Sequence, residues 1–139
     1  MQTIAETAPQ PKAMLWAGRI VTGIVIAFMI FDVGTKLIEM DVVREGMMRL
    51  GYPLRLASGF EIGVIEAICL ILYIIPRTSV LGAILLTAVM GGAIASHLRV
   101  GDPLPTHTLF GVYLGVLIWA GIYLRNPRLR DLIPVQTSN

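Results

Sequence analysis

The chain has 139 residues, 55% of them hydrophobic and only 14% charged. A soluble domain carries about 25% charged residues, so this composition excludes an ordinary water-soluble protein and indicates one that lies in lipid. The formal net charge of +2, with no basic run interleaved with aromatics, excludes a nucleic-acid partner. The single cysteine, Cys69, excludes an internal disulfide and a CxxC redox pair.

Three regions follow one another along the chain. Residues 1–12 are polar, contain Pro9 and Pro11, and are predicted to form a disordered tail. Residues 13–125 form the predicted membrane domain, and residues 126–139 a basic C-terminal tail. The first apolar segment, residues 13–31, is interrupted only by Arg19. No small-residue cleavage site follows it, so we predict an uncleaved membrane helix and not a signal peptide.

Two later segments are free of charge over long runs. Residues 78–96 give 19 uncharged residues and residues 108–124 give 17. At about 1.5 Å per residue, each can cross most of a ~30 Å hydrocarbon core. The segment 53–75 is less apolar, because it carries Arg55, Glu61 and Glu66. With Pro53 in its first turn and Pro76 closing it, we predict it as the remaining span of an all-α, four-helix transmembrane bundle.

A short helix is expected between the first two spans. In residues 41–51, Asp41 is the predicted N-cap, Val43, Met47 and Leu50 form an apolar face, and Gly51 is the stop. This spacing predicts an amphipathic helix at the membrane interface. An ordinary linker turn is the alternative.

Basic residues set the expected orientation. Those on the predicted inner side are Lys12, Arg19, Arg77, Arg125, Arg128 and Arg130; those on the outer side are Lys36, Arg44, Arg49, Arg55 and Arg99. This excess favours cytoplasmic termini. The aromatic side chains expected at the inner interface are Trp16, Tyr73, Trp119 and Tyr123.

Antiparallel threading brings ionisable residues from all four helices to the outer half of the bundle. They are Asp32, Lys36, Glu66, His97, Arg99 and His107. A carboxylate facing lipid costs on the order of 2.5–3.5 kcal/mol, so Glu66 is expected to face the interior, to be paired or to hold a proton. Its partner would be Arg99, His97 or Ser96 if it locks the bundle. Otherwise it serves a ligand or a proton, with Cys69 and Tyr73 on the same helical face.

The other polar residues of this layer leave similar alternatives. Asp32 and Lys36 are four residues apart, which favours an interfacial ion pair over catalysis. His97, His107 and Glu66 are the candidates for a metal, but no HxxH, HExxH or ExxH spacing is present, so no metal site is predicted. His97 is expected to bond Glu66 or a bound head group. His107 is expected in a water-exposed loop.

Small residues recur every four positions in the last two spans. Ala88, Gly92 and Ser96 do so in one, and Gly111 and Gly115 in the other. Such spacing lets helices approach closely. Close packing is therefore favoured over a ligand groove.

Several stretches together resemble the DoxX-like family of small bacterial membrane proteins. They are "WAGRIVTGIVIAFMIFDVGTK", "LGYP", "EAICLILYIIPRTSVLGAILLTAVMGGAIASHLRVGDP" and "LFGVYLGVLIWAGIYLR", and they cover about residues 15–124. The resemblance implies four membrane helices and a bacterial cytoplasmic membrane. It also implies a loose relation to DoxX and DoxD, whose name comes from a thiosulfate:quinone oxidoreductase.

Three functions follow as hypotheses. The first is an accessory or redox-linked membrane subunit whose outer pocket binds a small lipophilic ligand such as quinone. Its pocket residues would be Glu66, His97, Arg99 and Asp32, with Lys36 and Tyr73 as further candidates. The second is a quinone-linked oxidoreductase subunit acting on thiosulfate or a similar reductant, and the third is a small proton-coupled carrier. Catalytic residues are not identified, and a homo-oligomer or a redox subunit is left open as a partner.

Overall fold

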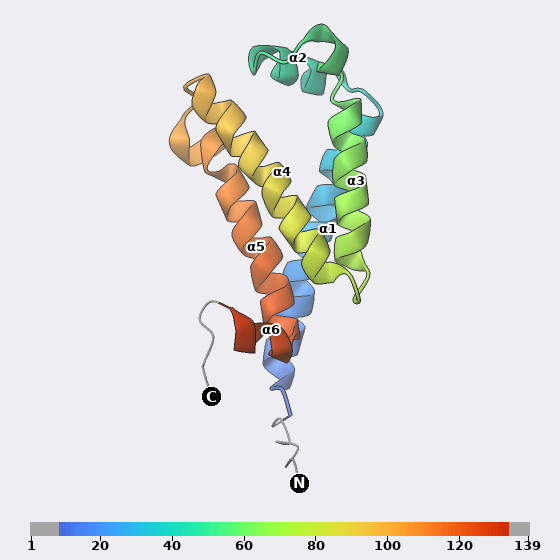
Figure 1. Cartoon of the computed structure of the whole chain (residues 1–139), viewed down its shortest axis with the longest axis vertical. Helices are drawn as coiled ribbons and strands as arrows, with labels where there is room; N and C mark the ends of the chain where they lie inside the picture. The colour runs from blue at the N-terminus through green and yellow to red at the C-terminus, as the bar shows by residue number, and fades with distance from the viewer. Residues whose placement is uncertain (1–8, 134–139) are drawn as a thin grey trace.

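The fold is described for residues 9–133 of a computed structural model. Within this range the chain is helical and contains no strand (Figure 1). The elements in chain order are α1 (Lys12–Leu37), α2 (Asp41–Arg49), η1 (Leu54–Leu56), α3 (Phe60–Ile74), α4 (Ser79–Arg99), η2 (Leu104–Thr108), α5 (Phe110–Arg125) and α6 (Pro127–Leu132). The predicted all-α class is confirmed.

Three helical stretches are long and apolar enough to cross a membrane: Lys12–Leu37, Ser79–Arg99 and Leu104–Arg125. The fourth predicted span, α3, has 15 residues. At 1.5 Å per residue it measures roughly 22 Å, less than a ~30 Å core. The four-span arrangement and the domain limits therefore stay predictions. Most of the predicted disordered tail (residues 1–8) and the end of the basic tail (residues 134–139) lie outside the described residues.

The segment before α3 differs from prediction. Pro53 does not enter the first turn of α3; it precedes the separate helical turn η1. The chain then reverses at Gly59, whose φ of 77° is a left-handed conformation that favours glycine. A Cβ there would also lie 2.8 Å from Cγ1 of Val43. Apolar composition alone does not show such a reversal, which is why the span was predicted to begin at Pro53 and not at Phe60.

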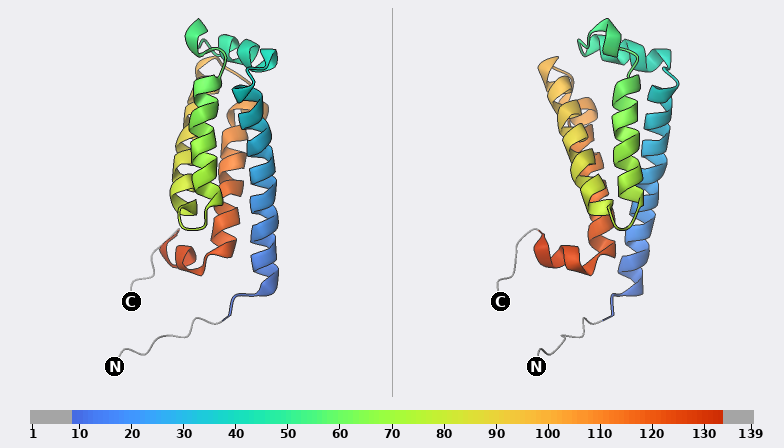
Figure 2. Two further views of the ribbon diagram at one scale, coloured as in Figure 1. Left: turned by 90° about the vertical axis from the view of Figure 1, so that its right-hand side faces the viewer. Right: turned by 45° about the vertical axis from the view of Figure 1, so that its right-hand side comes forward.

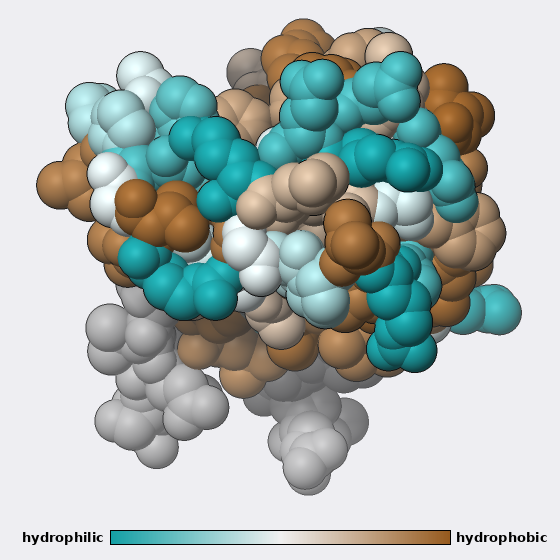
Figure 3. All heavy atoms as spheres, turned by 90° about the horizontal axis from the view of Figure 1, so that it is seen from above, coloured by the Kyte–Doolittle hydropathy of each residue, from teal (hydrophilic) through white to brown (hydrophobic). Residues whose placement is uncertain are grey.

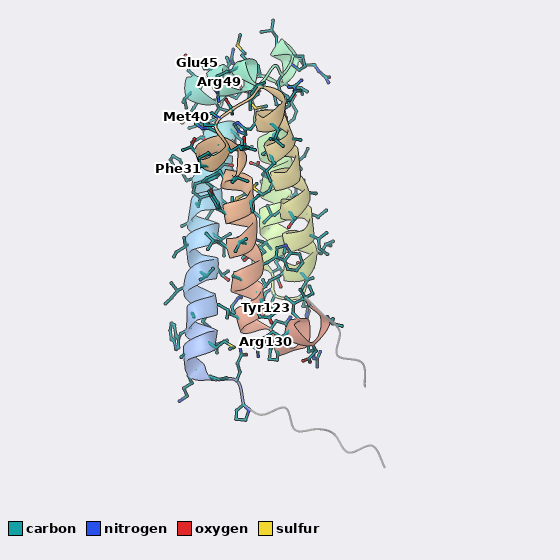
Figure 4. The ribbon with its side chains drawn as sticks, turned by 90° about the vertical axis from the view of Figure 1, so that its left-hand side faces the viewer. Phe31, Met40, Glu45, Arg49, Tyr123 and Arg130 are labelled. Atoms are coloured by element: carbon teal, nitrogen blue, oxygen red, sulfur yellow. The ribbon has the colours of Figure 1, made fainter. Side chains whose placement is uncertain are left out.

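The helix α2 lies across one end of the molecule (Figure 1). The predicted N-cap is wrong: Met40 is the N-cap, and Asp41 is the first helical residue, where its charge complements the helix dipole. Gly51 follows the helix with a φ of 78°, as expected of the stop residue. Met47 is buried, whereas Val42 and Met48 on the opposite face are exposed. Figure 4 shows Glu45 and Arg49 on this helix, far from Tyr123 and Arg130 at the opposite end.

The four long helices pack tightly at the end opposite α2. A Cβ at Gly82 on α4 would lie 2.2 Å from the backbone nitrogen of Tyr73, and one at Gly121 on α5 would lie 2.5 Å from Oγ1 of Thr22. Toward α2, α3 and α4 diverge (Figures 1 and 2). The buried core, which includes Met29 and Leu86, fills the middle of the bundle.

Glycine packing on α4 differs from prediction. A Cβ at Gly91 or Gly92 would meet nothing within 4 Å, so the expected close packing around Gly92 is wrong. On α5, Gly111 does approach α4 closely, because a Cβ there would lie 2.9 Å from Cγ1 of Ile94, whereas one at Gly115 would meet nothing. Ala88, Gly92 and Ser96, which are four residues apart, form a small-residue face on α4. At the level of Gly92, that face does not contact α3 because the two helices have already diverged.

Candidate functional site

A cavity of about 360 Å³ lies where the helices diverge, beneath α2. Apolar residues such as Phe28, Val89 and Leu114 form much of its wall. The polar and charged residues that line it are Asp32, Lys36, Tyr52, Glu66, Ser96, His97 and His107. The predicted layer of ionisable residues is thus gathered in large part around one space. Figure 3, seen from the α2 end, shows hydrophilic side chains over this end and hydrophobic ones around its sides.

Lys36 lies between two carboxylates in this cavity. Its Nζ donates to Oε2 of Glu66 at 2.7 Å and also to Oδ2 of Asp32, one turn earlier on α1. The Glu66 side chain is 4% exposed and that of Lys36 15%. Two carboxylates share one ammonium group, so with all three ionised the cluster carries one excess negative charge. An ammonium has three donors, and the two carboxylates use two of them.

The predicted ion pair between Asp32 and Lys36 is confirmed, whereas its position at the membrane interface stays a prediction. The expected partners of Glu66 (Arg99, His97 or Ser96) are wrong, because its hydrogen-bond partner is Lys36. Gly63, nearly one helical turn before Glu66, explains the approach of α1: a Cβ there would lie 2.8 Å from Cβ of Lys36. In the sequence, Lys36 lies at the same depth as Glu66. The lysine was not considered as a partner of Glu66 because its spacing from Asp32 already predicts a pair within one helix.

Three polar contacts join the end of α2 and the residues after it to the end of α4 and the loop that follows. Arg49 forms two hydrogen bonds with the carboxylate of Asp102, at 2.7 and 3.1 Å. The hydroxyls of Tyr52 and Ser96 are 2.9 Å apart, and Arg99 donates to the backbone carbonyl of Leu50. These contacts hold the polypeptide across the end of the cavity.

Asp102 also accepts from His97, whose Nδ1 lies 2.5 Å from Oδ2. Of the two partners expected for His97, Glu66 is therefore wrong, whereas a bound head group stays a prediction because the ring lines the cavity. The hydrogen bond from His97 and the adjacent Arg49 guanidinium hold the pKa of Asp102 below its ordinary value. Asp102 was not among the predicted site residues, since "GDP" indicates only a turn. Its carboxylate nevertheless connects α4 to α2.

His107 lies in the π-helical turn η2 and is exposed, so it is accessible as predicted, although in a helical turn and not in a loop. Its ring centroid is 5.8 Å from that of His97. Among residues 9–133, no group of three or more His, Cys, Asp or Glu side chains is placed to hold a metal ion.

Two predicted candidates lie away from the cavity wall. Tyr73 is fully buried at the tightly packed end, where its hydroxyl donates to the carbonyl of Ile118 at 2.9 Å. Arg99 is exposed and directed to the Leu50 carbonyl. Cys69 is a buried free thiol of the hydrophobic core. These placements favour structural roles for Tyr73, Arg99 and also Cys69.

Long apolar helices around a charged cluster define a small helical membrane protein. Such a protein keeps ionisable side chains between its helices, where they are paired. More specifically, the chain belongs to the DoxX-like family, whose family model matches residues 20–121. This match confirms the resemblance seen in the sequence. Comparison with curated proteins and with solved structures gives no match.

Proposed function

We propose that this protein binds a small lipophilic molecule with a polar head, of the quinone type, in the cavity beneath α2. The observation that carries the proposal is the Asp32–Lys36–Glu66 cluster, which lies in the wall of a cavity otherwise lined mainly by apolar groups. Ligand sites have this composition: apolar walls with a few polar groups that orient the ligand. The same cluster would serve no purpose against a purely hydrocarbon ligand.

The chemistry of the cluster suits a head group that exchanges between an oxidised form, which accepts hydrogen bonds, and a reduced form, which also donates them. The remaining donor of Lys36 suits a carbonyl oxygen of a quinone. The carboxylates of Asp32 and Glu66 suit the hydroxyl groups of its reduced form. Phe28 and Leu114 supply apolar contact for the ring and the first carbons of the tail. Glu66, Lys36, Asp32 and His97 are thus the proposed binding residues.

The membrane setting belongs to the same proposal. We place α3 as the fourth span, because it packs against α1 and α4 and runs antiparallel to both (Figure 2). α2 then lies along the outer surface of a bacterial cytoplasmic membrane, and both termini face the cytoplasm. Supporting this orientation, the positive-inside count favours the end that holds Arg125 and Arg128.

Binding is tested with the purified protein in nanodiscs and decylubiquinone as the probe, following quenching of the intrinsic tryptophan fluorescence. Saturable quenching is expected for the wild type. Glu66→Gln is expected to weaken binding about tenfold, equivalent to about 1.4 kcal/mol. The matched control is Tyr73→Phe, which changes a buried polar group away from the cavity. The absence of saturable binding to the wild type would overturn the proposal.

One observation favours proton handling as a second candidate function. The excess negative charge of the cluster favours uptake of one proton or of a cationic group. A proton-coupled carrier would use Glu66 or Asp32 for this purpose. Reconstituted liposomes carrying a pH-sensitive dye test it: an imposed pH gradient should dissipate faster with the wild type than with Glu66→Gln. Equal rates would exclude it.

The quinone-linked oxidoreductase role would add a redox reaction to the proposed quinone binding. In it, quinone bound in the cavity receives electrons from thiosulfate or a similar reductant, directly or through a partner subunit. Quinone reduction in nanodiscs, followed by its ultraviolet absorbance with thiosulfate as donor, tests the direct reaction. If quinone binds but is not reduced, only the accessory role remains.

A further inference from the structure

The cavity reaches the side surface of the bundle between α3 and α4. Gly92 and Ala93 of α4 line the cavity and are exposed. Ile62, on the facing side of α3, also lines it and is partly exposed. A Cβ at Gly92 would meet nothing within 4 Å, so no side chain of this chain fills the space at that point.

This opening lies at the depth of the membrane. Gly92 is seven residues before Arg99 at the end of α4, or roughly 10 Å along a helix that is long and apolar enough to span. The neighbouring outward faces are hydrophobic and exposed, with Ile65 and Ile68 on α3 53% and 54% exposed. Side chains of this kind are stable against lipid and not against water.

Three polar contacts cross the end of the cavity beneath α2. The Arg49–Asp102 pair, the Tyr52–Ser96 hydrogen bond and the bond from Arg99 to the Leu50 carbonyl link the end of α2 and the residues after it to the end of α4 and the loop that follows. No comparable polar contact between α3 and α4 beside Gly92 occurs within residues 9–133. The side opening is therefore the less obstructed path to the charged cluster.

We propose that the ligand enters the cavity sideways from the bilayer, between α3 and α4, and that Gly92 determines which ligands pass. The proposal rests on the proposed binding function and adds the route and the ligand class. A cavity of about 360 Å³ lies near the small end of ligand sites, which run to about 1,000 Å³. It accommodates a head group and a few carbons. The remaining tail of a long-chain amphipath passes out beside Gly92 and stays among the lipid chains.

Two adjacent glycines provide a matched test. Gly91 also meets nothing within 4 Å, but it lines a separate apolar groove between α4 and α5. Gly92→Leu is expected to weaken decylubiquinone binding in nanodiscs at least tenfold, and Gly91→Leu less than twofold. Unchanged melting temperatures of both variants would show that the fold is intact. Equal affinities of the two variants would overturn the sideways route, whereas a wild type that does not bind would overturn the proposed function instead.

A second measurement tests the route without a ligand. In a Cys69→Ala background, which removes the buried native thiol, Gly92→Cys is labelled in liposomes with either a lipid-soluble pyrene maleimide or a membrane-impermeant sulfonated maleimide. Faster reaction with the lipid-soluble reagent supports an opening to the bilayer. Faster reaction with the impermeant reagent would show that the opening faces water and would overturn the proposal. Decylubiquinone is expected to slow pyrene labelling of Gly92→Cys and not of Gly91→Cys, and equal slowing would count against passage beside Gly92.

Discussion

Lys36 on α1 and Glu66 on α3 form an ion pair of 2.7 Å between two helices, and the second carboxylate on Lys36 comes from Asp32 in its own helix. Both partners of the interhelical pair are largely buried. A buried charge that loses its partner costs far more than the pair contributes. The cluster therefore constrains every substitution made in the cavity.

Lys36→Met is expected to leave Asp32 and Glu66 as neighbouring carboxylates without a cation. The free energy of unfolding should fall by about 3–5 kcal/mol at neutral pH. Adding Glu66→Gln to this variant should restore part of the loss, since it removes one of the unpaired charges. Reversible unfolding of the purified proteins in mixed detergent micelles measures both values. A Lys36→Met variant as stable as the wild type would show that the cluster does not stabilise the fold.

Gly82→Ala should disrupt the tightly packed end of the bundle. The added methyl would lie 2.2 Å from the backbone nitrogen of Tyr73, which cannot move without separating α3 from α4. Overpacking of this kind costs about 1–3 kcal/mol or more. Gly92→Ala is the matched control on the same helix, and it should change stability little. Fluorescence-detected size-exclusion chromatography after a heating series compares the two, and similar melting points would contradict this account.

Tyr73→Phe separates a structural role from a binding role. The hydroxyl it removes is buried and donates to the Ile118 carbonyl, so the variant should lose about 1 kcal/mol of stability. Decylubiquinone affinity should be unchanged, because the side chain does not line the cavity. Measuring the melting temperature and the affinity on one preparation checks both. A loss of affinity without a loss of stability would return Tyr73 to the binding residues.

The Asp102 contacts predict acid sensitivity. The folded state lowers the pKa of Asp102 through His97 and Arg49, so the carboxylate stabilises the fold while it is ionised in both states. That contribution is complete above the unfolded value of about 3.9 and is lost as the pH falls through the lower folded value. The stability difference between the wild type and Asp102→Asn should therefore be constant near pH 5 and shrink toward pH 3. Glu45→Gln, at an exposed carboxylate in the middle of α2, is the control. A difference that does not change with pH would contradict the Asp102 contacts.

Much of the fold could be predicted from hydrophobic runs, because uninterrupted apolar segments of 17 residues or more leave few alternatives to a membrane helix. The start of α3 could not, since it follows Gly59, whose left-handed conformation and close approach to Val43 are not visible in the composition. Depth along each helix correctly brought Asp32, Lys36, Glu66 and His97 to one level. It could not give the direction in which each side chain points, and so the expected partners of Glu66, and Glu66 as a partner of His97, were wrong. The same limit affected Gly92, whose small-residue face proved to be open.

The bundle is narrow where Gly82 and Gly121 bring the helices together and broad beneath α2. In the proposed four-span arrangement, a protein of this shape would occupy more area in one leaflet than in the other. The lateral pressure of the lipids beside its broad end would then act on α3 and α4, so the lipid composition and curvature of the bilayer would affect the volume of the cavity.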